Sequence, residues 1–105
     1  MGRFLYIGNM KIPKTIKLFG RTIKIKVVAK VNKDFDHLGE YLHDDGIIKI
    51  QRGLSQEDTE QVYLHELTHA ILLSLGKDSL SDDEPFVDTF ASLLHQSIKT
   101  AKYQP

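Results

Sequence analysis

Apolar and charged residues alternate in the first third of the chain. Ile23 and Ile25 alternate with Lys24 and Lys26, which is the two-residue period of a strand with one buried face. Gly20 precedes this stretch and follows a similar one, so it indicates the turn of a hairpin. The pattern therefore predicts two strands joined by a short turn, with the lysines on the solvent side.

A second hairpin is predicted over residues 39–51. Asp45 and Gly46 form a common turn pair, and the segment that follows them is rich in isoleucine. Two successive hairpins predict a small, mainly antiparallel sheet in the first half of the chain.

The period changes to that of a helix after Leu54. Ser55 followed by an acid at Asp58 resembles a capping box, and apolar residues then recur at helical spacing up to Leu75. Gly76 suits the position that follows the last turn of a helix. This helix is apolar over much of its circumference, so we expect it to be central to the core.

A second amphipathic helix is predicted from about Ser81 to Lys102, after a linker at 77–80. Pro85 is tolerated in a first helical turn, and the acids around it suit the positive end of the helix dipole. A sheet followed by two helices defines an α+β domain.

Length and composition limit the alternatives. The chain has 105 residues, of which 41% are hydrophobic and 27% charged, so we expect one globular domain over 1–105, with tails at 1–9 and 100–105. It lacks cysteine, which excludes disulfides and thiolate metal sites. We find neither a membrane span nor a secretory signal and expect a cytoplasmic protein.

Charge is distributed unevenly along the chain. Residues 1–33 carry nine Lys or Arg and no acid, whereas residues 34–105 carry five Lys or Arg and all fourteen acids. Such asymmetry can indicate a nucleic-acid contact. The solvent face of a half-buried strand is the simpler explanation for Lys24 and Lys26.

The motif with the clearest chemistry is His-Glu-Leu-Thr-His at residues 65–69. His65 and His69 are four residues apart on the predicted helix, so both imidazoles can reach one zinc ion. Glu66 lies beside them, where a general base could face the water at the metal. The alternative is a pair of partly buried histidines on a core helix, with Glu66 in solvent.

Catalytic zinc needs a third protein ligand and an open position. The third His of metzincins would fall at Leu75, which excludes that class. A glutamate from the second helix remains, and the acidic residues that precede and begin that helix supply candidates. Asp82 and Asp83 are further candidates for this role.

The motif followed by Glu84-x-x-x-Asp88 resembles the gluzincin pattern, in which a downstream glutamate helix donates the third zinc ligand. In size the chain is similar to minigluzincins, and its motifs also resemble those of phage and bacterial ImmA/IrrE-like peptidases. The resemblance spans roughly residues 39–95. It implies a zincin-like fold, Glu84 as a ligand, and Asp88 as the acceptor that orients a ligand histidine.

The resemblance implies a zinc-dependent metallopeptidase in which Glu66 is the catalytic base and a peptide or protein is the substrate. The hairpin at 39–51 would then offer an edge strand to extended substrate. Two other functions are considered. One is a catalytically silent zinc-binding regulatory module, and the other is nucleic-acid binding through the basic hairpin.

Three further residues are candidates for the cleft. His95 follows Glu84 by three helical turns on the same face, although a packing histidine is the simpler interpretation. Tyr41 and His43 belong to the second predicted hairpin and could lie at the cleft edge. The tail at 100–105 is a candidate for a latency segment in the cleft, as in some minigluzincins.

Overall fold

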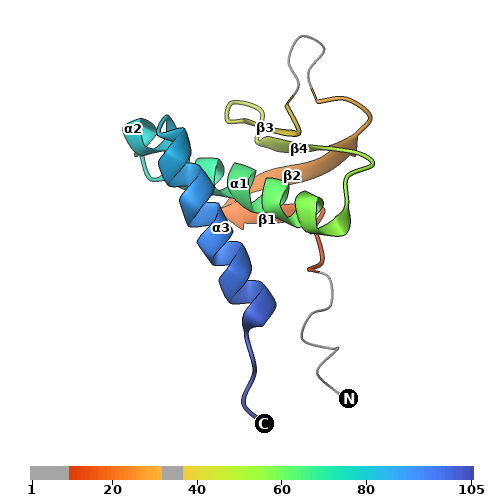
Figure 1. Cartoon of the computed structure of the whole chain (residues 1–105). Coiled ribbons are helices and arrows are strands. Elements are labelled where there is room, and N and C mark those ends of the chain that lie inside the picture. Colours follow the sequence, from red (N-terminus) through yellow and green to blue (C-terminus); the bar gives the residue numbers. More distant parts are fainter. Residues whose placement is uncertain (1–9, 32–36) are drawn as a thin grey trace.

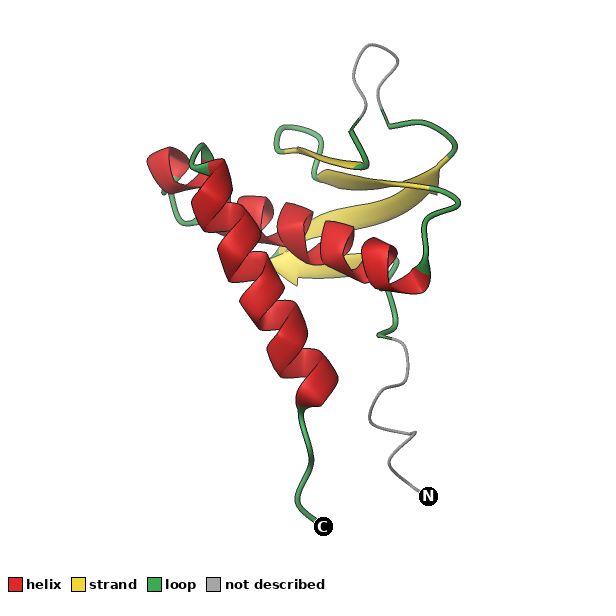
Figure 2. Ribbon diagram, viewed as in Figure 1, coloured by secondary structure: helices red, strands yellow, loops and turns green. Residues whose placement is uncertain are grey.

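Four strands precede three helices in the computed structural model, which describes residues 10–31 and 37–105 (Figures 1 and 2). The predicted N-terminal tail at 1–9 lies outside the described residues. The α+β class predicted from the sequence is confirmed. The described elements are β1 (Thr15–Leu18), β2 (Arg21–Val28), β3 (Gly39–Leu42), β4 (Ile47–Gln51), α1 (Gln56–Ser74), α2 (Asp78–Ser81) and α3 (Glu84–Thr100).

The sheet is mixed, with the strand order β1-β2-β4-β3. Both predicted hairpins form, and each pairs its two strands in antiparallel fashion. The hairpins are joined side by side through β2 and β4, which run parallel. The prediction of a mainly antiparallel sheet is therefore right for each hairpin and wrong for their junction. Hydrophobic period identifies the buried face of a strand but contains no information about the direction of its partner.

Both hairpins turn at the predicted glycines. Phe19 and Gly20 connect β1 to β2 with φ values of 53° and 78°, as a two-residue turn between right-twisted strands requires. Gly46 has φ of 65° at the end of the second turn. In this region glycine is favoured because it has no Cβ to clash with the backbone.

Helix α1 begins and ends where its sequence predicts. The Ser55 hydroxyl accepts the backbone N–H of Asp58 at 3.0 Å. At the other end Gly76 has φ of 74°, and the Lys77 N–H donates to the Leu72 carbonyl at 2.8 Å. These bonds satisfy polar groups that the helix itself leaves unpaired.

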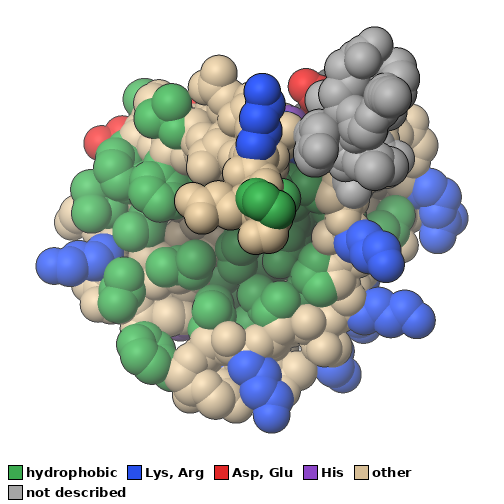
Figure 3. Space-filling view, turned by 90° about the horizontal axis from the view of Figure 1, so that it is seen from below, with side chains coloured by type: hydrophobic (Ala, Val, Ile, Leu, Met, Phe, Trp, Pro, Cys, Tyr) green, Lys and Arg blue, Asp and Glu red, His purple; other side chains and the backbone are tan. Residues whose placement is uncertain are grey.

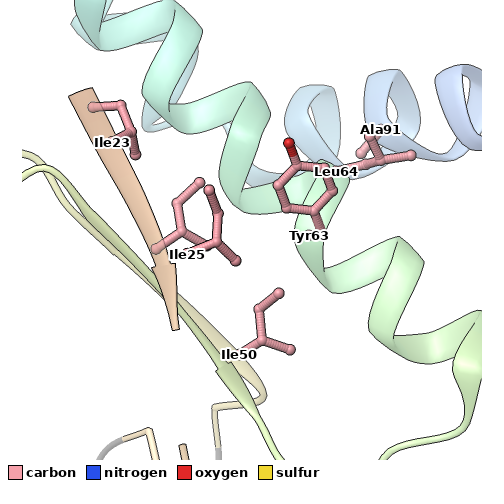
Figure 4. Packing of buried hydrophobic residues seen from close by; sticks show 7 residues of the cluster. Ile23, Ile25, Ile50, Tyr63, Leu64 and Ala91 are labelled. Carbon is pink, nitrogen blue, oxygen red and sulfur yellow. The ribbon is translucent and has the colours of Figure 1, made fainter. Parts of the chain in front are cut away.

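The core lies where α1 crosses the sheet (Figure 4). Isoleucines of β2 and β4 face the helix, and Tyr63 and Leu64 face them from α1. Ala91 is the contribution of α3 to this cluster. The central place predicted for α1 is confirmed, because it contacts the sheet on one side and α3 on the other.

Helix α3 packs mainly on α1 and crosses it in Figure 1. The Asp83 carboxylate accepts the Phe86 N–H at 3.1 Å and starts the helix, with Pro85 in the first turn. Its end at Thr100 is close to the predicted end. The linker expected before it contains the single-turn helix α2.

The exposed face of β2 carries lysine side chains. Lys24 and Lys26 are exposed while Ile23 and Ile25 are buried, as the alternation predicts. In Figure 3, Lys and Arg side chains surround a hollowed apolar area.

Among the described residues, no helix has the length and apolar character needed to span a membrane.

Candidate metal centre

Helix α1 places both histidines of the motif on one face. His65 and His69 are one turn apart, and their Nε2 atoms lie 3.2 Å from each other. Glu84, at the start of α3, faces both rings. Its Oε1 is 3.2 Å from His65 Nε2, and its Oε2 is 3.3 Å from His69 Nε2. The structure thus brings the three predicted ligands together, although Glu84 is 15 residues from His69 and 19 residues from His65 in the chain.

The spacing of these atoms fits a small divalent cation. Ligand atoms about 2.0–2.1 Å from a tetrahedral zinc ion are separated from one another by roughly 3.3 Å. Two imidazole nitrogens and a carboxylate oxygen are also ligand types that zinc prefers. The group formed by His65, His69 and Glu84 could therefore hold a metal.

Each histidine has a hydrogen-bond partner on its other ring nitrogen. Asp88 Oδ1 is 2.8 Å from His65 Nδ1, as the gluzincin resemblance implies. Ser81 Oγ is 2.8 Å from His69 Nδ1. If each Nδ1–H donates to its oxygen, the lone pair of Nε2 is free for a metal, and the ring is held in place.

Sequence reasoning did not identify Ser81. It directly follows the linker predicted at 77–80, at the expected start of the second helix, and no motif marks a serine at this position. The short helix α2 turns its side chain inward, and Ser81 is buried there. A buried polar residue cannot be distinguished from an exposed one in so short a polar segment.

If the His65, His69 and Glu84 group binds zinc, removal of the Ser81 hydroxyl should weaken that binding. We expect Ser81→Ala to lower zinc affinity by about tenfold or more, because partners that orient a metal ligand contribute about 10–100-fold. Competition with a chromophoric chelator measures the effect. Ser79→Ala is the matched control, since Ser79 belongs to the same helix and is exposed. Equal affinity in the two variants would show that Ser81 does not orient His69.

Glu66 lies beside the three candidate ligands with its carboxyl group buried. Burial raises the pKa of Glu66 to about 8, and the negative charges of Glu84 and Glu40 act in the same direction. A hydrogen bond from the backbone of Tyr41 opposes this shift. The alternative that Glu66 is a solvated residue is wrong, because it is only 7% exposed.

Strand β3 approaches α1 closely because residue 39 is a glycine. A Cβ at Gly39 would lie 2.4 Å from Val62 Cγ1 and 3.1 Å from Glu66 Cγ. Real Cβ atoms do not come so close to other carbons, so a larger residue would force the strand away. The absence of a side chain at this position allows the backbone of β3 to reach the Glu66 carboxyl group.

A cleft of about 810 Å³ opens at the candidate metal centre. It lies between β3, α1 and α3, and Glu66 and Glu84 are both in its wall. Burial lowers the pKa of His69, against the attraction of Glu84. Neutral imidazole is the form that binds a metal, so this environment suits a ligand.

The remaining residues that the sequence suggested for the cleft do not all lie there. Tyr41 lines the cleft, and its hydroxyl is 2.8 Å from His43 Nδ1. His95 does not line it. Its Nε2 is 2.7 Å from a carboxylate oxygen of the buried Glu60, so it is the packing histidine of the simpler interpretation. Asp83 caps α3 instead of joining the candidate ligands.

The C-terminal tail lies far from the cleft. It leaves the end of α3 opposite to Glu84 (Figure 1), and no residue after Ser92 lines the cleft among the described residues. The hypothesis of a tail that blocks the cleft finds no support in this arrangement.

The fold and the site define an α+β domain with a His-His-Glu group that lines an open cleft. Comparisons of the chain with models of protein families, with curated proteins and with solved structures found no match.

Proposed function

We propose that this protein is a zinc-dependent peptidase of the gluzincin type. The observation that carries the proposal is the convergence of His65 Nε2, His69 Nε2 and the Glu84 carboxylate within 3.3 Å of one another. Glu66 lies beside them in the wall of the same cleft. Three ligands, a neighbouring carboxyl group and space for a substrate are the components that metal-assisted hydrolysis needs.

An open site favours catalysis over a purely structural role. Structural zinc is enclosed by four protein ligands, whereas catalytic zinc keeps a position for water or substrate. Three protein ligands converge among the described residues, and the Glu84 side chain is 57% exposed. The catalytically silent zinc module remains the second candidate, and it predicts metal binding without hydrolysis.

Bound zinc would supply a Lewis acid that polarises the peptide carbonyl and acidifies a water molecule. Glu66 accepts one proton from the attacking water as its oxygen bonds to the carbonyl carbon. The same carboxyl group then donates this proton to the amide nitrogen as the C–N bond breaks. The products are a new carboxyl group and a new amine, and Glu66 returns to its carboxylate form.

The substrate would be an extended peptide held against β3. This strand is at the edge of the sheet, and residues 38–41 line the cleft. An edge strand offers backbone N–H and C=O groups that can pair with a peptide of any sequence. Side chains around Tyr41 would then select among substrates.

Zinc content is the direct test of the ligand set. We expect about one zinc per chain in the untagged protein and a loss of affinity of more than about 100-fold in Glu84→Ala, because even partners outside the ligand set contribute about 10–100-fold. Mass spectrometry of protein dialysed against trace zinc measures both. Asp82→Ala is the matched control, since it removes a neighbouring exposed acid.

Three outcomes can be distinguished. Full zinc in the control and little in Glu84→Ala would support the proposed centre. Full zinc in both variants would mean that another residue is the third ligand. A wild-type protein that binds no zinc would contradict the proposed peptidase function. It would favour the basic hairpin as a nucleic-acid-binding surface, and the affinity of that surface for nucleic acid would fall steeply with salt.

A further inference from the structure

A second cluster of polar side chains lies inside the molecule, away from the cleft. Its centre is Glu60, which is fully buried. Oε1 of this residue is 2.7 Å from His95 Nε2 and 2.9 Å from Lys99 Nζ. Oε2 accepts from the Met10 backbone N–H at 2.9 Å and from Gln56 Nε2 at 3.0 Å. A buried carboxylate is costly unless it is paired and hydrogen-bonded, and here both oxygens are satisfied.

The cluster connects three parts of the chain. Glu60 and Gln56 belong to α1, His95 and Lys99 to α3, and Met10 to the segment that leads into β1. The Gln56 side chain also donates to the Met10 carbonyl at 3.0 Å. These are directional contacts, in addition to the apolar packing between the same elements.

Glu60 is on the same helix as two candidate ligands, and two of its partners, His95 and Lys99, are on the same helix as the third. It precedes His65 by five residues. His95 follows Glu84 by eleven residues, or about 16 Å along α3 at 1.5 Å per residue. The α1–α3 pair is therefore joined by polar contacts at two places, the metal centre and the Glu60 cluster.

Few side chains of α3 are fully buried. The helix packs on α1, with a smaller contact to α2, and only Val87, Ala91 and His95 of its residues are buried. Val87 and Ala91 are small apolar residues between the two polar sites. The burial of apolar surface is non-directional, so two small side chains alone define the crossing angle of the helices only loosely. A directional contact at the far end restricts that angle.

We propose that Glu60 is a positioning residue for the metal centre, which it acts on by fixing the angle of α3 on α1. Without its bonds to His95 and Lys99, α3 can pivot about Val87 and Ala91, and the Glu84 carboxylate moves relative to His65 and His69. This inference rests on the metal centre of the proposed function but not on peptide hydrolysis.

The first test compares zinc affinity with folding. We expect Glu60→Gln to lower zinc affinity by about tenfold, as for other residues that orient ligands. Lys99→Met removes one partner from a partly buried position and should have a smaller effect in the same direction. Glu57→Gln is the matched control, because it makes the same change at an exposed position of α1. Circular dichroism at the temperature of the titration reports whether each variant is folded.

The second test needs no metal. The chain has no cysteine, so spin labels can be attached to Asp58→Cys on α1 and Thr89→Cys on α3, both at exposed positions. The distance distribution between the labels should be broader or shifted in Glu60→Gln and in Lys99→Met than in Glu57→Gln. A residue that stabilises the fold without orienting α3 would leave this distribution unchanged.

The outcomes separate this inference from the proposed function. Weaker zinc binding together with a changed distribution in folded Glu60→Gln or Lys99→Met supports the positioning role. Unchanged affinity and distribution in a folded variant overturn it, even if the wild type binds zinc and hydrolyses peptides. If the wild type binds no zinc, the proposed function fails, and so does the role of Glu60 in positioning a metal centre. A changed distance distribution would then show only that Glu60 orients α3.

Discussion

Under the proposed mechanism, replacement of Glu66 by Gln should strongly reduce the rate of hydrolysis and leave the metal in place. The amide is similar in size to the carboxyl group, but it cannot accept a proton from water. General acid–base catalysis contributes about 10²–10⁴-fold, so the rate should fall by roughly that factor. A fluorescence-quenched unfolded protein serves as substrate, because it presents many peptide sequences. Zinc content should stay near that of the wild type, since Glu66 is not among the converging ligands.

Glu40→Gln is the control for this experiment. Glu40 also lines the cleft, and its charge contributes to the raised pKa of Glu66, but it has no proposed role in proton transfer. It should retain most of the activity. Hydrolysis at the wild-type rate by a zinc-loaded Glu66→Gln protein would exclude Glu66 as the base.

The metal-free protein should lose stability as the pH falls from about 4.5 to about 2. Burial of Glu60 acts to raise its pKa, but hydrogen bonds from Lys99, His95, Gln56 and the Met10 backbone outweigh it and lower the pKa to about 2 from an ordinary 4.5. The unfolded chain therefore binds the proton more tightly than the folded chain. The contribution of Glu60 to the free energy of unfolding is complete above pH 4.5 and disappears as the carboxylate is protonated.

Urea unfolding between pH 2 and pH 6 measures this dependence. Glu60→Gln should unfold about 3 kcal/mol more easily at pH 6, because removal of one partner from a buried ion pair costs about 3–5 kcal/mol. Its stability should also change less with pH in the acid range. Glu57→Gln should keep the wild-type slope, since Glu57 is exposed. Identical slopes for wild type and Glu60→Gln would contradict the assignment.

Local signals in the sequence were sufficient to predict the four strands, the two long helices and the two histidines of the candidate site, but not the short helix α2. The capping serine and the terminal glycine defined α1, and helical spacing alone placed His65 and His69 on one face. Glu84 was located by resemblance to a known pattern and not by geometry, because nothing local says how two helices cross. The structure supplies that crossing and brings Glu84 to the histidines.

Contacts between distant segments could not be predicted in the same way. Ser81 is a polar residue in a short polar segment, and Glu60 is an acid in the second turn of a helix. Such residues are usually exposed. Their burial depends on which elements come to cover them. The parallel pairing of β2 with β4 was missed for a related reason, since it joins segments that no turn connects.

The position of β3 at the edge of the sheet has a consequence for self-association. An edge strand can pair with a strand of another molecule as readily as with a substrate. Proteins often prevent this with lysines, and the opposite edge, β1, carries Lys17. Strand β3 has Glu40 as its one charged residue, and under the proposed function this edge has to stay open to peptides. If the proposed function holds, β3 of one molecule would pair with β3 of another in concentrated protein and compete with peptide, so that dilution should increase the specific activity.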